Sequence, residues 1–159
     1  MLTRLLPKQI DNDYRGHVLA IWLLAPLALI KLVQGANVAG LLGAGKTRQV
    51  LEGVDKVPVG VFPAEAASHL LFLFAAWGLC IFVSGLLGIV VLLRYRAMIP
   101  LMYLLLLIEQ AGRKALSTIH LDRPFVSFAA SPANLMNWAF LLVMVIGFLL
   151  SVSGRRLRT

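Results

Sequence analysis

Four long apolar runs separated by polar segments dominate the hydropathy pattern of this chain. Each run is long enough to cross the hydrocarbon core of a bilayer as a helix, which takes about 17–25 residues. Apolar positions fill whole stretches instead of one helical face, as is typical of membrane spans. The pattern predicts spans at residues 17–34, 64–93, 97–120 and 133–152, with external loops at residues 35–63 and 121–132.

These spans predict a single membrane domain over residues 1–159, with an all-α fold that is an integral membrane four-helix bundle. Pro124 and Pro132 preclude a continuous helix through the second loop, and Ser131 suits the N-cap of the last span. The basic turn Arg94–Arg96 is so short that the second and third spans must be antiparallel neighbours.

Composition supports the membrane interpretation and predicts the orientation. The chain is 60% hydrophobic and 14% charged, with net charge +8 and mean hydropathy +0.87, whereas soluble domains are about 45–50% apolar and about 25% charged. The N-terminal tail, the Arg94–Arg96 turn and the C-terminal arginines lie on one side of four spans, so the positive-inside rule predicts that both termini are cytoplasmic. The sequence contains no basic patch interleaved with aromatic residues, so it gives no indication of nucleic-acid binding.

The first loop contains GLLGAGKT, residues Gly40–Thr47, which matches the phosphate-loop pattern GxxxxGK[ST]. That chemistry requires a strand before the loop and a helix after it, so that backbone amides surround the phosphates. Here a membrane span precedes the motif, and no strand ending in a Walker-B-type aspartate exists. We therefore interpret the match as a chance one and reject nucleotide binding.

Small residues recur every four positions along the second span, at Ala76, Cys80, Ser84 and Gly88. Such a stripe lets another helix approach closely. Packing within the bundle is the first interpretation, and a contact with a second chain is the alternative. Because Cys80 is the single cysteine, no internal disulfide or dithiol redox centre is expected.

The third span carries polar residues where a membrane helix is usually apolar. Those at spacings of three and four residues share one stripe that should face protein or a cavity. We define the predicted polar intramembrane cluster as Lys31, Tyr103, Glu109, Gln110, Arg113, Lys114 and His120.

Lys31 belongs to this cluster because of its depth. It lies about 21 Å along the helix from His17, and Glu109 lies about 20 Å from Arg96, at 1.5 Å per residue. The sequence therefore allows a Lys31–Glu109 pair, and the spacing of four residues also allows a Glu109–Arg113 pair. The cluster is either a structural network that fixes helix registry or a site for transport or anion binding.

The sequence predicts no catalytic residues, no metal site and no cofactor. His69 and His120 could each ligate haem or a metal, but no paired mid-span histidines face each other. No nucleophile motif surrounds the serines.

The stretches DNDYRGH and RYRAMIPLMYLLLLIEQAGRK resemble an uncharacterised family of small four-span bacterial inner-membrane proteins with no known activity. The resemblance implies a bacterial inner (cytoplasmic) membrane location. It also implies that the family's recurring motifs include Tyr14, Arg15, His17, Arg94, Arg96, Glu109 and Arg113. The GLLGAGKT loop is not part of that pattern.

From these observations we expect a non-enzymatic accessory or scaffolding subunit of a larger membrane complex. Its partners would be membrane lipids and either a membrane-protein partner or a second copy. The alternative is a small carrier or lipid/anion-binding protein that uses the Lys31, Glu109 and Arg113 cluster.

Overall fold

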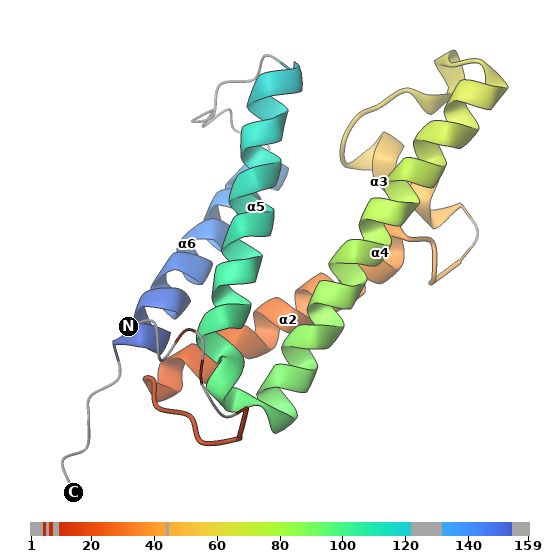
Figure 1. Ribbon diagram of the computed structural model, residues 1–159. Coiled ribbons are helices and arrows are strands. Elements are labelled where there is room, and N and C mark those ends of the chain that lie inside the picture. Colours follow the sequence, from red (N-terminus) through yellow and green to blue (C-terminus); the bar gives the residue numbers. More distant parts are fainter. Residues whose placement is uncertain (1–4, 6, 8–9, 44, 122–131, 154–159) are drawn as a thin grey trace, which may run out of the picture. The chain divides into compact units, whose positions relative to one another are not determined.

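The computed structural model describes residues 5, 7, 10–43, 45–121 and 132–153, and these are helical without a strand (Figure 1). Three helices are long and apolar enough to cross a membrane: α2, Val18–Val38; α4, Ala64–Arg94; and, from Leu135 onward, α6, Pro132–Val152. These helices confirm the predicted all-α fold and the presence of helices that could cross a membrane. Residues 122–131, most of the predicted second loop, lie outside the described residues.

The fourth long helix, α5, spans Ile99–Leu121 and follows a 3-10 turn, η2, at Arg96–Met98. At 23 residues it is as long as a membrane helix, but Glu109 lies near its middle and Arg113 and Lys114 lie in its second half. Two short elements lie in the first predicted loop: α3, Lys46–Gly53, and the 3-10 helix η1, Val59–Val61. The helix α2 continues four residues beyond the predicted end of the first span, over residues 35–38 with the sequence GANV. This sequence is compatible with a helix that packs closely against its neighbour.

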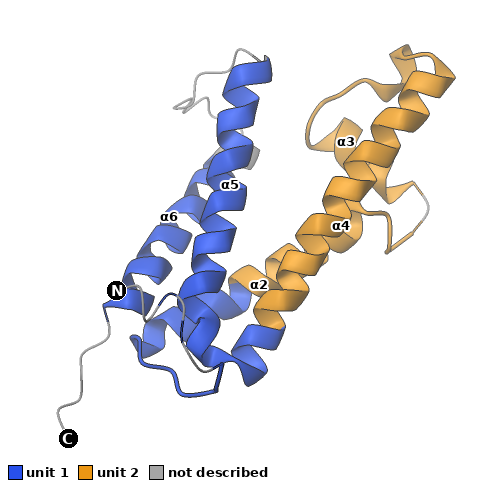
Figure 2. Ribbon diagram, in the orientation of Figure 1, with its two compact units in different colours: residues 1–26, 90–159 blue, residues 27–89 orange. Residues whose placement is uncertain are grey.

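The chain divides into two compact units, residues 1–26 with 90–159 and residues 27–89 (Figure 2). Both α2 and α4 run from one unit into the other. The division in α2 falls at Pro26, where the missing N–H removes one helical hydrogen bond.

In the unit of residues 27–89, α2 and α4 are antiparallel and their backbones approach each other at glycines. A Cβ atom at Gly85 would lie 2.7 Å from Cα of Leu32, and one at Gly78 would lie 2.6 Å from the carbonyl carbon of Val38. The reciprocal contact is at Gly35, opposite Phe82. Only glycine permits this separation, so these three positions determine how closely the two helices pack.

A glycine also ends α2. The N–H of Leu41 donates to Ala36 O at 2.9 Å and the N–H of Gly40 donates to Asn37 O at 3.1 Å. Gly40 has φ +74°. These are the paired hydrogen bonds and the left-handed residue of a Schellman motif. Gly40 therefore serves as a helix C-cap.

In the other unit, α5 packs along α6, and Tyr103 of α5 is buried beneath Gly147 of α6. The start of α2 is attached to the end of α6, because His17 N donates to Leu150 O at 3.1 Å. The segment before α2 also reaches the α4–α5 turn, where Ala97 N donates to Asp11 O at 3.3 Å.

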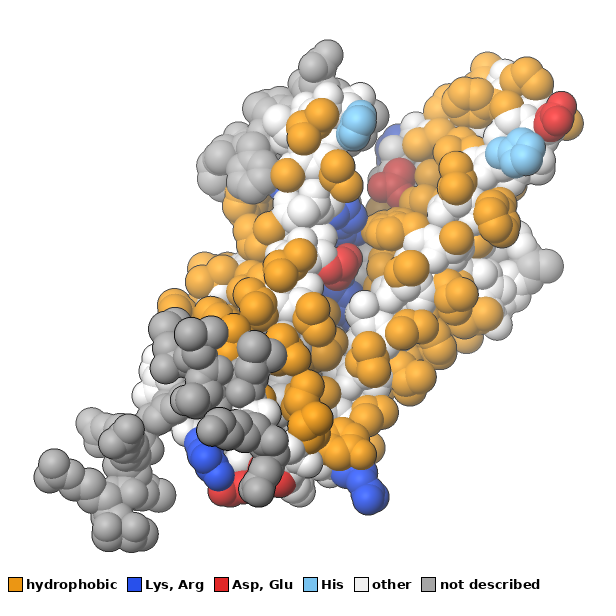
Figure 3. Space-filling view, viewed as in Figure 1, with side chains coloured by type: hydrophobic (Ala, Val, Ile, Leu, Met, Phe, Trp, Pro, Cys, Tyr) orange, Lys and Arg blue, Asp and Glu red, His pale blue; other side chains and the backbone are white. Residues whose placement is uncertain are grey.

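The space-filling view shows hydrophobic side chains over most of the visible surface of α4 and α5 (Figure 3). Side chains as large as Phe72 and Leu73 of α4 and Leu105 of α5 are exposed. Lipid would cover such a surface, since soluble monomers rarely expose contiguous apolar patches above a few hundred Å².

Candidate functional site

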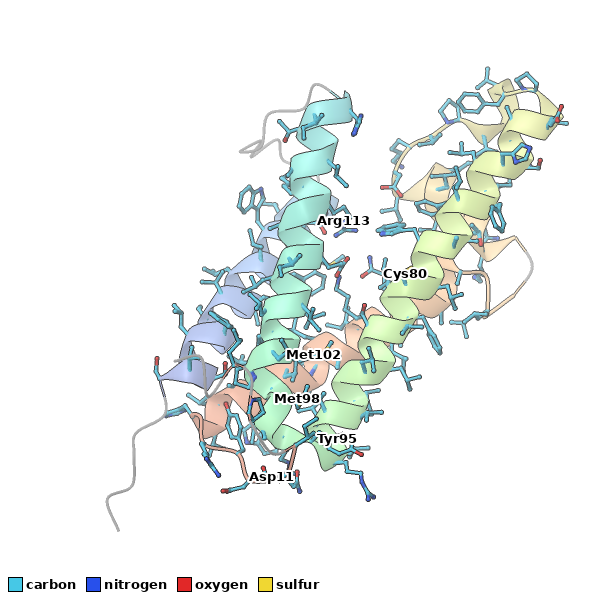
Figure 4. All side chains as sticks on the ribbon, viewed as in Figure 1. Asp11, Cys80, Tyr95, Met98, Met102 and Arg113 are labelled. Atoms are coloured by element: carbon cyan, nitrogen blue, oxygen red, sulfur yellow. The ribbon has the colours of Figure 1, made fainter. Side chains whose placement is uncertain are left out.

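A hydrogen-bonded cluster of Gln110, Arg113 and Asn137 joins α5 to α6. Arg113 Nη2 donates to Gln110 Oε1 at 2.8 Å and to Asn137 Oδ1 at 3.3 Å, and Gln110 Nε2 donates to the same Asn137 oxygen at 3.2 Å. Gln110 is 5% exposed. Figure 4 labels Arg113 in the upper half of α5. We call these three side chains the amide–guanidinium cluster.

The next residue of each helix extends the contact. The ammonium nitrogen of Lys114 lies 5.1 Å from the centroid of the Trp138 ring, within the range of a cation–π interaction. Ser117 and Thr118 donate their hydroxyl hydrogens to Lys114 O, at 2.8 Å and 3.2 Å. Two cationic side chains of α5 are thus held against polar and aromatic side chains of α6.

The predicted polar cluster does not include Asn137 or Trp138. The available signal was the dipeptide Asn137–Trp138, which pairs an amide with an aromatic ring near the end of an apolar helix. Tryptophan is enriched at membrane interfaces because its ring is apolar and its N–H is polar.

The two residues of the predicted central ion pair lie in different compact units. Lys31 is 3% exposed in α2. Glu109 is half-buried in α5 with its Oε1 atom enclosed. Pairing of Glu109 with Lys31 or with Arg113 stays a prediction.

Two other members of the predicted polar cluster, Tyr103 and His120, lie apart from the amide–guanidinium cluster. Tyr103 is fully buried seven residues before Gln110, about 10 Å along the helix, and its hydroxyl donates to Ala20 O at 2.7 Å. His120 is exposed near the end of α5. The polar residues predicted to share one stripe of the third span therefore lie in three separate environments.

Tyr14 occupies a second polar site, just before α2. Its hydroxyl donates to His17 O at 3.2 Å, and burial raises its pKa from 10.0 to about 12. A Cβ atom at Gly16 would collide with the Tyr14 hydroxyl and with Ser151 O. Within the DNDYRGH segment, Tyr14 and Gly16 therefore fit closely against the end of α6.

In the predicted small-residue stripe on α4, Ala76 and Cys80 lie outside the contact with α2, whereas Gly88 belongs to the buried face. Ala76 and Cys80 are exposed, Ser84 is half-buried with its hydroxyl donating to Cys80 O at 2.9 Å, and Gly88 is buried. The buried face of α4 is instead Gly78, Ile81, Gly85 and Gly88. The intramolecular contact is therefore rotated away from Ala76 and Cys80, and those two residues remain on an outward face.

Of the residues in this motif, 40–43 and 45 lie between α2 and α3, and Lys46 and Thr47 begin α3. Within the described part of this loop, Gly43 N donates to Gly40 O at 3.3 Å and Lys46 N donates to Gly43 O at 3.2 Å. A phosphate loop would instead direct such amides at the anion. With Gly40 acting as a C-cap, the geometry favours the rejection of nucleotide binding, which itself stays a prediction.

Among the residues that the structure describes, no three His, Cys, Asp or Glu side chains come together as a possible metal site. His69 and His120 are both exposed. Chemically, the α5–α6 arrangement can hold charged side chains inside an apolar helix pair and present cations to an anionic group.

No protein-family model matches the chain, and searches of curated proteins and of solved structures found nothing similar to it.

Proposed function

We propose that the chain is a four-span membrane protein that acts as a non-enzymatic accessory or scaffolding subunit of a larger membrane complex. The observation that carries this proposal is the outward face of α4. Ala76 and Cys80 are small, exposed and separated by one helical turn, and the contact with α2 uses another face. Small residues at this spacing favour close approach of a helix from a second protein.

The amide–guanidinium cluster supports α5 as the fourth span. A polar side chain inside a membrane is tolerated when it is paired with other protein groups, and Gln110 and Arg113 are hydrogen-bonded to α6. The His17–Leu150 hydrogen bond supports termini on one side, because it joins the start of the first span to the end of the last.

The excess of arginine at that end, at Arg15, Arg94 and Arg96, supports a cytoplasmic location. The family resemblance extends the proposal to a bacterial inner membrane. Cysteines introduced at the N-terminus and at Arg155 should be protected from impermeant thiol reagents in intact cells, and one at Lys56 should be labelled. The reverse labelling pattern would overturn this orientation.

The docking function is tested by enlarging the outward face of α4. Ala76→Leu should abolish co-purification of a stoichiometric partner in mild detergent, because the larger side chain would hold the helices apart. Leu86→Phe is the control, since it enlarges an exposed position about a quarter turn around the helix axis from Ala76 and about 15 Å along it. If both variants retain the same proteins as the wild type, the Ala76 face contacts lipid and the proposal fails.

A second candidate is a small carrier or lipid/anion-binding protein, and the burial of Lys31 favours it. A lysine residue that is 3% exposed in an apolar helix is costly to bury, and such residues often mark ligand pathways. Arg113→Gln should then reduce the amount of anionic lipid or small anion that co-purifies. Arg48→Gln is the control, because Arg48 is exposed and paired with Glu52 at 2.9 Å.

A further inference from the structure

Along the axis of α4, the connection between α2 and α4 starts far from the residue at which α4 begins. Val38, the last residue of α2, lies against Gly78. The helix α4 begins 14 residues earlier, at Ala64, which is about 21 Å further along its axis. The connection therefore has one end at the level of Gly78 and the other at the level of Ala64.

The part of α4 between these two levels has an apolar surface. Phe72 and Leu73 are 68% and 65% exposed, and they lie about 8 Å or more beyond Gly78 along the helix. Side chains of this size require lipid around them, so the membrane extends past the level at which α2 ends. The 31 residues of α4 would be about 46 Å long, close to the 40–45 Å thickness of a bilayer with its headgroups.

The connection itself exposes large apolar side chains next to both helices. Leu41 and Leu42 lie three and four residues after the end of α2, and Val61 and Phe62 lie three and two residues before the start of α4. Val61 is 74% exposed. The apolar surface of the spans thus continues onto both ends of the connection.

These exposed side chains belong to a folded segment. Leu51 of α3 and Val59 of η1 are buried, and α3 contacts η1. Arg48 pairs with Glu52 on the polar face of α3, where Lys46 and Gln49 are also exposed. A segment with a small core, exposed apolar ends and an exposed polar face that carries both charges suits the boundary between acyl chains and headgroups.

We propose that residues 39–43 and 45–63 form an interfacial cap that binds the phospholipid headgroup layer of the membrane in which the protein sits. Leu42 and Val61 insert toward the acyl chains, and Lys46 and Lys56 face the lipid phosphates. The cap shields the α2–α4 junction on the membrane side opposite Arg94. The proposal rests on the membrane location and is independent of any accessory role.

Spin-label accessibility tests this proposal directly. Nitroxide labels at Leu42→Cys, Val61→Cys and Gln49→Cys are introduced separately into the Cys80→Ala chain. Each variant is reconstituted alone in nanodiscs of phosphatidylcholine and phosphatidylglycerol. Labels at 42 and 61 should be several-fold more accessible to oxygen, which partitions into lipid, than to a water-soluble nickel chelate. The label at 49 should show the reverse preference.

Other outcomes overturn the proposal. If labels at 42 and 61 respond to the nickel chelate as the label at 49 does, the connection is in water. If they are shielded from both relaxants, protein and not lipid covers them, as in self-association. Each variant must keep the wild-type helical circular dichroism, and Gln49→Cys serves as the folded reference because its side chain is exposed.

Discussion

The Tyr103 hydroxyl group donates a hydrogen bond to the backbone carbonyl oxygen of Ala20, with 2.7 Å between the two oxygen atoms. Tyr103 is fully buried in α5, and Ala20 lies in the first turn of α2. This bond joins residues 83 positions apart and fixes the start of the first helix against the third predicted span.

Tyr103→Phe should lower the free energy of unfolding by about 0.5–1.5 kcal/mol, the usual net value of one hydrogen bond. The ring and its packing under Gly147 are retained, so any loss reports on the hydroxyl group. Thermal melting in detergent, followed by circular dichroism, measures the effect. Tyr95→Phe is the control, since Tyr95 is only half-buried, and an equal loss in both variants would contradict the assignment.

The glycines of the α2–α4 contact give the next prediction. Gly85→Ala should destabilise the protein by about 1–3 kcal/mol, the range for inserting atoms into a well-packed interior. A Cβ atom there would meet the backbone of Leu32 and, at 2.9 Å, the carbonyl oxygen of Ala28, and backbone atoms cannot rotate away.

Gly112→Ala is the matched control for this substitution. Gly112 also lies inside a helix, but a Cβ atom there would meet nothing within 4 Å. Alanine in an open helical position favours the helix by about 0.5–1 kcal/mol over glycine. If Gly85→Ala were as stable as Gly112→Ala, the close approach of α2 and α4 would be wrong.

The helices could be predicted because long apolar runs and prolines are local signals. The first span of 17–34 became Val18–Val38, and the last of 133–152 became Pro132–Val152. The face on which α4 packs could not be predicted. Two small-residue stripes share that helix, and only the partner helix distinguishes Gly78 and Gly85 from Ala76 and Cys80.

The polar residues show the same limit. Their spacing placed Tyr103, Gln110 and Arg113 on one face of a helix, but spacing does not reveal which neighbour each side chain meets. The Tyr103 hydroxyl donates to a backbone carbonyl oxygen of α2, whereas Gln110 and Arg113 donate to a side-chain amide oxygen of α6. Such partners depend on tertiary packing, which a single sequence does not encode locally.

Tyr14 leads to a prediction about alkaline pH. Burial raises its pKa from 10.0 to about 12, so the folded protein keeps a proton that the unfolded chain releases. The free energy of unfolding should therefore decrease as the pH rises from about 10 to about 12, and Tyr14 should contribute no pH dependence below that window. Tyr14→Phe should remove this part of the decrease.

The measurement is thermal stability in detergent at pH 8, 10 and 11 for both proteins. Lysines also titrate in this range, so only the difference between wild type and Tyr14→Phe is interpreted. Parallel pH curves would contradict a half-buried Tyr14 that stays protonated in the folded protein.

The last prediction concerns Glu109. If Glu109 pairs with Lys31, Glu109→Gln should destabilise the protein more than Gln110→Ala, because it leaves the buried Lys31 ammonium group without its counter-charge. Removal of one partner of a buried ion pair typically costs about 3–5 kcal/mol. The loss should be smaller here if the lysine side chain can extend toward the interface.

A double-mutant cycle separates the possible partners of Glu109. On the Glu109→Gln background, Lys31→Met should restore part of the lost stability if Lys31 is the partner, because it removes the buried charge. Arg113→Met should do so if the pair within α5 dominates, although it also breaks the hydrogen bonds to Gln110 and Asn137. A Gln110→Ala, Asn137→Ala double-mutant cycle measures separately how much stability the hydrogen bonds of this cluster contribute. Hydrogen bonds between membrane helices average about 0.6 kcal/mol. If Glu109→Gln melts like the wild type, or if neither second substitution couples to it, Glu109 faces water or headgroups and the buried ion pair does not exist.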